Sequence, residues 1–262
     1  MPEFPEEAVV LPLRAAGCVF AEDEARLLVA AAGTAAELDA LVDRRVAGEP
    51  LEHILGWVEF SGLRITVAAG VFVPRRRTEV LVEAAVGLAW SGAVVVDLCC
   101  GSGALGVAVA TAVDGVELHA ADVDPAAVDC ARGNVARVGG HVHAGDLYAA
   151  IPPALRGRVD LLLANVPYVP SDAIALMPPE ARLHEARVAL DGGVDGLDVA
   201  RRVIARAPLW LAPGGSLLFE TSQDQASAAA AVAAGAGLVA RVVTDDDRGA
   251  TVVVASQPAP PS

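Results

Sequence analysis

The sequence predicts a doubly wound α/β fold, in which a mostly parallel, seven-stranded sheet with an antiparallel edge strand follows a small helical domain. Two observations predict this fold. Beyond Ser91, apolar runs of strand length alternate with segments of helical spacing. The last two runs are separated only by a short polar turn, so they are expected to form a hairpin. Because 54% of the 262 residues are hydrophobic and 20% are charged, the chain can bury a core.

The first part of the chain has a different pattern. Residues 1–55 are expected to form the helical domain, because apolar residues recur at helical spacing over 22–47. This run breaks near Gly33, where Thr34 and Glu37 fit a capping box. Residues 56–78 are expected to form a short linker of strand and loop, in which "LRITV" (63–67) alternates like a strand. Helical spacing resumes after Thr78, a candidate N-cap.

The main domain is expected to span residues 79–256. The continuous apolar run "AVVVDLCC" (93–100) is typical of a buried parallel strand. Further strands are expected in "GVELHAADVD" (115–124), "HVHAGDLY" (141–148), "VDLLLANVPY" (159–168) and "GGSLLFETS" (214–222). The hairpin is expected in "GLVARVVTDDD" (237–247) and "ATVVVAS" (250–256), and the tail 257–262 is expected to be disordered.

Charge and composition exclude several classes of function. A net charge of −14 opposes binding of a phosphate backbone, so a broad nucleic-acid surface is not expected. The N-terminus lacks the basic and apolar regions of a secretory signal, and no apolar stretch is long enough to span a bilayer. The four cysteines form no CxxC pair and indicate reduced thiols of a cytoplasmic protein. His141 and His143 share a strand face, but no further ligand is spaced to complete a site, so no metal is expected.

In a doubly wound sheet, ligands bind at the carboxyl ends of the strands, beside the point where the strand order reverses. Residues 101–106, which follow the first strand, match the GxGxxG dinucleotide fingerprint, and Asp122 ends the second strand where it could hold a ribose hydroxyl. A nicotinamide cofactor is one ligand that such a loop can bind. Asp97, at the tip of the first strand, favours a cationic ligand instead. Asp146 adds a third strand-end carboxylate, so the pattern favours S-adenosyl-L-methionine, which carries an ammonium, a sulfonium and a ribose diol but no phosphate.

Four segments carry a family resemblance. "VVDLCCGSGALGVAVA" resembles the first motif of class I methyltransferases, and "NVPY" (165–168) resembles the Asn-Pro-Pro-Tyr signature of amino-group and amide methyltransferases. The segment from "GEPLEHILG" to "VPRRRTEVLVE" (48–83) and the later "LDGGVDGLD" (190–198) resemble the protein glutamine-N5 methyltransferases, whose sheet is Rossmann-like. The resemblance covers most of the chain from Gly48 onward. Three departures stand out: Cys99 replaces the first motif glycine, Val166 replaces the first signature proline, and the helical domain is shorter.

This resemblance implies S-adenosyl-L-methionine as cofactor, S-adenosyl-L-homocysteine as product, and a protein bearing an exposed glutamine as substrate. The implied catalytic residues are Asn165, Pro167 and Tyr168, and the substrate-binding residues are these three with Val166 and Arg75. Arg75 and Thr78-Glu79 are placed at the lip of the cleft, whereas Arg76 and Arg77 are expected to be solvated. The expected cofactor-binding residues are Asp97, Cys99, Cys100, Gly101, Ser102, Gly103, Asp122, Asp146, Leu147 and Asn165.

Other readings of the same residues stay open. An amino-group methyltransferase acting on nucleic acid shares the signature, although the acidic charge counts against it. A small-molecule N-methyltransferase is compatible with the short helical domain. A nicotinamide-dependent dehydrogenase is compatible with GxGxxG alone. At Asn165, the alternative to a substrate clamp is an Asx-type turn that ends the strand.

Overall fold

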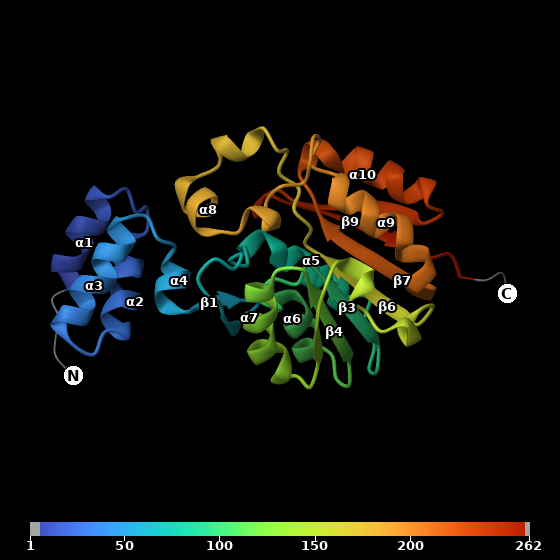
Figure 1. Ribbon diagram of the computed structural model, residues 1–262, viewed down its shortest axis with the longest axis horizontal. Coiled ribbons are helices and arrows are strands. Elements are labelled where there is room, and N and C mark those ends of the chain that lie inside the picture. Colours follow the sequence, from blue (N-terminus) through green and yellow to red (C-terminus); the bar gives the residue numbers. More distant parts are fainter. Residues whose placement is uncertain (1–5, 260–262) are drawn as a thin grey trace.

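The computed structural model of the protein describes residues 6–259, in which a group of N-terminal helices lies beside an α/β domain (Figure 1). The helical group consists of α1 (Glu6–Ala15), α2 (Ala21–Ala31), α3 (Ala35–Val46) and α4 (Leu51–Leu55). These helices enclose a small core of their own, to which Leu13, Leu28 and Ile54 contribute. The expected break between α2 and α3 is confirmed. Thr34 is the N-cap of α3 and accepts from the Glu37 N–H at 3.2 Å, while the Glu37 carboxylate accepts from Gly33 N at 2.8 Å.

A hairpin and a short loop connect the helical group to the main domain. The expected strand is β2 (Leu63–Thr66), and it pairs with β1 (Trp57–Phe60), which the sequence pattern did not reveal. The chain then passes a 3₁₀ turn at Arg76–Thr78 and enters α5 (Glu79–Val86). The Thr78 side chain does not cap this helix, contrary to expectation. Its hydroxyl donates instead to Glu220 at 2.6 Å.

The large sheet confirms the predicted fold class. Its order is β5-β4-β3-β6-β7-β9-β8, so the order reverses between β3 and β6. The strands are β3 (Val94–Leu98), β4 (Glu117–Asp122), β5 (His141–Ala144), β6 (Val159–Ala164), β7 (Leu211–Glu220), β8 (Val239–Asp245) and β9 (Ala250–Ser256). The first five are parallel. The antiparallel edge is the β8–β9 hairpin, in which the reversed strand β9 lies against β7 and β8 is outermost.

Helices cover both faces of the sheet. On one face, α5, α6 (Ala104–Ala112) and α7 (Pro125–Ala136) bury a core that includes Val95, Leu161 and Leu163. On the other face, α9 (Asp198–Trp210) and α10 (Gln223–Gly235) bury a core that includes Val96 and Leu162. Alternate residues of β3 and β6 therefore point into different cores. This double burial explains why both segments are continuous apolar runs.

The segment between β6 and α9 contains α8 (Pro179–His184) and lies between the helical group and the sheet (Figure 1). Arg45, only 8% exposed, connects α8 to the helical group. Its guanidinium donates to Glu24 and to Glu180, each at 2.6 Å. The Arg45–Glu24 pair is buried and is screened by salt much less than a surface pair, and the half-exposed Glu180 connects α8 to it.

The tail 257–262 is in part ordered, because Gln257 N donates to Gly215 O at 2.8 Å, while residues 260–262 lie outside the described residues. Across residues 6–259, none of the helices combines the length and the apolar character that a bilayer crossing requires.

Asn134 of α7 joins three parts of the domain. It is fully buried, and its side-chain oxygen accepts from Thr66 N at 3.0 Å. Its nitrogen donates to Thr66 O at 2.8 Å and to Ser102 O at 2.9 Å. The linker hairpin and the loop after β3 are therefore both fastened to α7 through one amide.

Replacing Asn134 by alanine should leave these backbone groups unpaired inside the protein. We expect Asn134→Ala to lower the free energy of unfolding by about 1–3 kcal/mol, the usual cost of a buried unsatisfied polar group. Urea denaturation measures this as a lower midpoint at constant slope. Arg132→Ala, at an exposed position of the same helix, is the matched control and should change stability by less than about 0.5 kcal/mol. Equal effects of the two substitutions would contradict this role.

Candidate functional site

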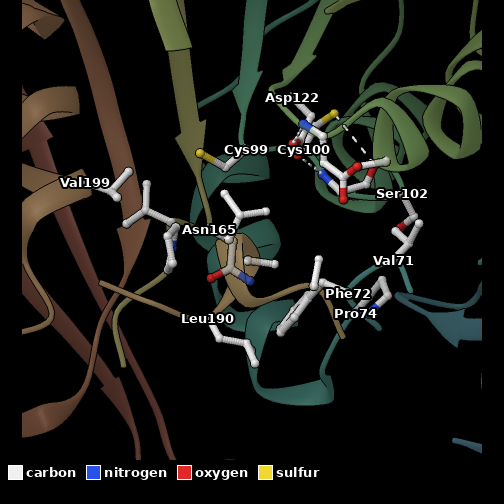
Figure 2. A pocket seen from close by; sticks show the side chains of 18 of the residues that line it. Val71, Phe72, Pro74, Cys99, Cys100, Ser102, Asp122, Asn165, Leu190 and Val199 are labelled. Carbon is white, nitrogen blue, oxygen red and sulfur yellow. Dashed lines mark hydrogen bonds between the residues drawn. The ribbon is translucent and has the colours of Figure 1, made fainter. Parts of the chain in front are cut away.

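A cavity opens at the carboxyl ends of β3, β4, β5 and β6, where the strand order reverses. Figure 2 shows Cys99, Cys100 and Asp122 on one side of it. Leu190 lies on the opposite side, together with the linker residues Phe72 and Pro74. The cavity therefore draws residues from the loops after four strands and from the linker. This is the place where doubly wound sheets bind their ligands.

Asp122 organises the loop that follows β3. One carboxylate oxygen accepts from Gly101 N at 2.9 Å, and the other accepts from Asp124 N at 2.9 Å. Each oxygen can accept a further hydrogen bond, so the group can hold a ligand hydroxyl while it holds the loop. Burial raises the pKa of Asp122, and the backbone N–H donors oppose that shift.

The glycines of the GxGxxG segment have different functions. Gly101 has φ +55° and lines the cavity, and a Cβ added there would meet nothing within 4 Å. Gly103 and Gly106 do not line the cavity, contrary to the expectation for Gly103. A Cβ on Gly103 would lie 2.8 Å from Val135 of α7, and one on Gly106 would lie 2.7 Å from Leu118 of β4. Those two glycines allow close packing of α6, whereas Gly101 leaves space for a ligand.

Asp97 lies beneath the loop and is not part of the cavity wall. Its carboxylate is fully buried and accepts from Gly106 N at 3.0 Å, and its other oxygen has no hydrogen-bond partner among the described residues. Burial raises the pKa of this carboxyl to about 7. Ser102 does line the cavity, and its hydroxyl is likewise buried and unpaired within residues 6–259. Within residues 6–259, one unpaired polar atom thus lies in a residue of the cavity wall and a second lies beneath the loop.

Two non-glycine residues of the cavity have left-handed backbones. Cys99 has φ +55° and Leu147 has φ +49°. A glycine adopts this conformation freely, whereas an L-residue is strained in it by roughly 1–2 kcal/mol. The sequence therefore has cysteine at a position whose backbone favours glycine. Burial raises the pKa of the Cys99 thiol, which stays protonated and serves as an apolar wall rather than a nucleophile.

The other expected cofactor residues also line the cavity. Cys100 is buried in its wall, and Leu147 follows Asp146 after β5. The Asp146 carboxylate accepts from Arg202 of α9 at 2.5 Å, and both residues line the cavity. Arg202 could not be identified from the strand-end rule, because it lies on a helix and not at a strand end.

Asn165 follows β6 and lies between the linker and Val199 of α9 (Figure 2). Val166 is the next residue and also lines the cavity. Among the described residues, no hydrogen bond involves the Asn165 amide, and none is accepted by the Val166 carbonyl. An Asx-type turn would use the Asn165 side chain on its own backbone, and no such bond is present in residues 6–259. Two adjacent acceptors in residues that line the cavity are therefore without a partner within residues 6–259.

The chain resembles known proteins along most of its length. Residues 62–194 match the family described as methyltransferase small domain. Two curated relatives are named release factor glutamine methyltransferase: identity is 42% over 196 residues with the protein of Gloeobacter violaceus and 40% over 188 residues with that of Geobacter sulfurreducens. These alignments cover 72% and 71% of this chain, and they span 68% and 65% of the relatives' own lengths. The chain belongs to the release factor glutamine methyltransferase family.

Membership of the release factor glutamine methyltransferase family confirms the resemblance drawn from the sequence. The fold also resembles that of a 16S rRNA N2 methyltransferase of T. thermophilus, solved in complex with AdoMet and guanosine, with a TM-score of 0.57 and 19% identity. That match covers 77% of this chain and 49% of the other. At this identity the likeness concerns the fold alone.

The arginines of the linker differ from expectation. Arg75 lines the cavity, as expected for the lip, and donates to the buried Glu185 at 2.5 Å. Arg76 is exposed, as expected. Arg77 is only partly solvated: its side chain is 42% exposed, but it also lines the cavity and donates to Glu220 at 2.9 Å and to the Tyr168 hydroxyl at 2.7 Å. The prediction missed these two contacts because the sequence does not show where the side chains of consecutive loop residues point.

Removing the Asp122 carboxylate should weaken cofactor binding. We expect Asp122→Ala to reduce affinity for S-adenosyl-L-methionine by about 1–3 kcal/mol, because ligand hydroxyls and the Gly101 N–H both lose an acceptor. Isothermal titration calorimetry measures the change. Asp129→Ala, at an exposed position of α7 that does not line the cavity, is the control. An unchanged dissociation constant for Asp122→Ala would remove this carboxylate from the cofactor site.

The buried Asp97 should make stability depend on pH. Its pKa is raised from 3.8 to about 7, so the folded protein favours the neutral carboxyl. The stabilisation that the neutral Asp97 carboxyl gives to the folded protein is complete at low pH and is lost as pH rises to about 7. The unfolding free energy of the parent, measured relative to Asp97→Asn by urea denaturation, should therefore fall between about pH 4 and pH 7 and then level off. A difference that is constant across this range would refute the raised pKa.

Proposed function

We propose that the protein transfers a methyl group from S-adenosyl-L-methionine to the side-chain amide nitrogen of a glutamine in a protein substrate, a release factor. The observation that carries this proposal is the pair of acceptors at Asn165 and Val166 that have no partner among the described residues, beside a cavity at the reversal of strand order. The names of the relatives support the same substrate class.

The residues of the cavity fit this cofactor. Asp122 offers free lone pairs for a ribose diol, and Gly101 leaves space beside it. The Asp122 carboxylate in the cavity wall opposes a phosphate-bearing ligand and favours a cationic one, whereas burial favours the neutral form of Asp97 and Asp146 is paired with Arg202. The unpaired Ser102 hydroxyl adds a neutral donor and acceptor. When bound, the cofactor supplies an electrophilic methyl group and leaves as S-adenosyl-L-homocysteine.

The protein's part in the reaction is to orient a weak nucleophile. The nitrogen of an amide donates its lone pair to the neighbouring carbonyl, so it must be aimed at the methyl group to react. Its two N–H groups can donate to the Asn165 side-chain oxygen and to the Val166 backbone carbonyl. Because the second acceptor belongs to the main chain, replacing the usual proline by valine at 166 preserves it. The proton can leave after transfer, so no general base is required beforehand.

Pro167 and Tyr168 complete the proposed substrate site. The proline ring fixes φ after Val166, which stiffens the loop that carries both acceptors. Tyr168 lines the cavity and offers an aromatic surface for the planar amide. Arg75 lies on the linker side of the same cavity, where an incoming protein chain would pass. We assign these residues to the substrate rather than to the cofactor.

The direct test is a transfer assay with labelled S-adenosyl-L-methionine and purified release factor. We expect label in the protein, and mass spectrometry should place one added methyl on a glutamine. Replacing that glutamine in the substrate by alanine should abolish labelling. Incorporation into RNA or a small molecule from cell extract, and none into protein, would favour the other methyltransferase readings. Stabilisation by NAD and not by S-adenosyl-L-methionine in a thermal shift would indicate a dehydrogenase.

Asn165 should affect transfer and not cofactor binding. We expect Asn165→Ala to lower kcat about 10²-fold, by analogy with the loss of one preorganised polar contact. The dissociation constant of S-adenosyl-L-methionine should stay close to that of the parent. Val166→Pro is the matched control at the next position and should keep activity, since the carbonyl is retained. Transfer at the parent rate by Asn165→Ala would mean that the loop is only a turn.

A further inference from the structure

Tyr168 is held at both its hydroxyl and its backbone carbonyl by residues that the family resemblance did not single out. The hydroxyl donates to Glu220 at 2.7 Å and accepts from Arg77 at 2.7 Å. The carbonyl accepts from the side-chain nitrogen of Gln225 at 2.9 Å. Tyr168 is three residues beyond Asn165, so these bonds fix the end of the loop that carries the two unused acceptors.

Glu220 is the common acceptor on the hydroxyl side. It lies at the end of β7 and is only 1% exposed. One oxygen accepts from Arg77 at 2.9 Å and from the Tyr168 hydroxyl, and the other accepts from Thr78 at 2.6 Å. Arginine can only donate and the carboxylate can only accept, so the direction of the Tyr168 O–H bond is determined. Burying a charged carboxylate so completely destabilises the folded protein unless the carboxylate is paired in this way.

Gln225 is the corresponding residue on the carbonyl side. Its side-chain nitrogen donates to Tyr168 O and to Asp195 O, each at 2.9 Å. Its oxygen accepts from the Thr221 hydroxyl at 3.0 Å and from Ser222 N at 3.2 Å. The amide therefore joins the loop after β6, the glycine-rich segment 192–196 and the start of α10.

The glycine-rich segment packs directly on the same backbone. A Cβ added to Gly192 would lie 2.8 Å from Pro167 O, and one added to Gly196 would lie 2.3 Å from Tyr168 O. Only glycine permits this approach without movement of the loop. The motif "LDGGVDGLD" thus forms a close support for Pro167 and Tyr168.

We propose that Glu220 and Gln225 are positioning residues for methyl transfer. Through the two ends of Tyr168 they hold Asn165 and Val166 in the geometry that receives the substrate amide. Neither residue touches the substrate in this arrangement. The proposal rests on the proposed function, because it concerns the rate of that transfer. It predicts that both residues act on kcat and leave cofactor binding unchanged.

The test compares Glu220→Gln in two backgrounds. In the parent we expect kcat to fall about tenfold, since a small displacement of a substrate-holding group is sufficient for that loss. The KM for the release factor and the dissociation constant of S-adenosyl-L-methionine should not change. In a Tyr168→Phe background the same substitution should have a much smaller effect on kcat, because the hydroxyl is gone and only the bonds of Glu220 to Arg77 and Thr78 remain to be altered. Equal losses of kcat in both backgrounds, or a change in cofactor affinity, would overturn the proposal.

Gln225→Glu provides a second, nearly isosteric test. It removes the N–H donors to Tyr168 and Asp195 and retains the oxygen that accepts from Thr221 and Ser222. We expect a loss of kcat similar to that of Glu220→Gln. Gln223→Glu, at an exposed position of the same helix, is the matched control and should retain the parent rate. A parent rate in Gln225→Glu would also overturn the proposal.

A measurement without activity separates this proposal from the proposed function. The chain has two tyrosines, so tyrosine labelled with ¹³C at Cζ gives two NMR signals, which Tyr148→Phe assigns. The Tyr168 signal should shift in Glu220→Gln and keep its position in Gln223→Glu. If it does not shift, the positioning role fails even where transfer is observed. If it shifts while no glutamine is methylated in any release factor, the proposed function fails and the contact itself stands.

Discussion

The register between the two central strands is the constraint on which the site depends. Leu98 of β3 pairs with Ala164 of β6, and Leu98 also pairs with Ala121 of β4. The chain therefore leaves these three strands at nearly the same level, at Cys99, Asp122 and Asn165. Side chains alternate along a strand, so shifting one strand by one residue would turn its side chains from one core to the other. The group at the end of that strand would then move away from the cavity. The strongly apolar composition of β3 and β6 fixes this register through burial on both faces.

Sequence reasoning located the strands and most of the cavity, because parallel strands buried on both faces are continuous apolar runs and ligands gather at their ends. It could not determine side-chain direction. Asp97 lies within β3, and its carboxylate turns beneath the loop rather than into the cavity. Gly103 has the spacing of a ligand-binding glycine but is required by contact with α7. Local spacing is the same in both cases, and only the packing of distant segments distinguishes them.

The remaining misses have the same physical origin. Thr78 and Arg77 were interpreted from their immediate neighbours, as a helix cap and as a solvated charge. Both are drawn instead to Glu220, more than 140 residues later in the chain. Glu220 ends β7 and could have been found by applying the strand-end rule to the fifth strand as well. A buried carboxylate at such a position must be paired with donors, and these come from the loops that pack next to it in the fold. A single sequence does not show which loops those are.

The left-handed backbone at Cys99 shows that the glycine of a sequence motif can reflect a requirement for one backbone conformation. The loop after β3 keeps its bond from Gly101 to Asp122 although the first motif glycine is absent. The fold therefore preserves a dihedral angle at this position, and glycine is the least strained way to achieve it rather than the only way. Relatives recognised by the letters of the motif are a subset of the chains that can form this turn. A search by backbone geometry would reach members that have drifted further than this one.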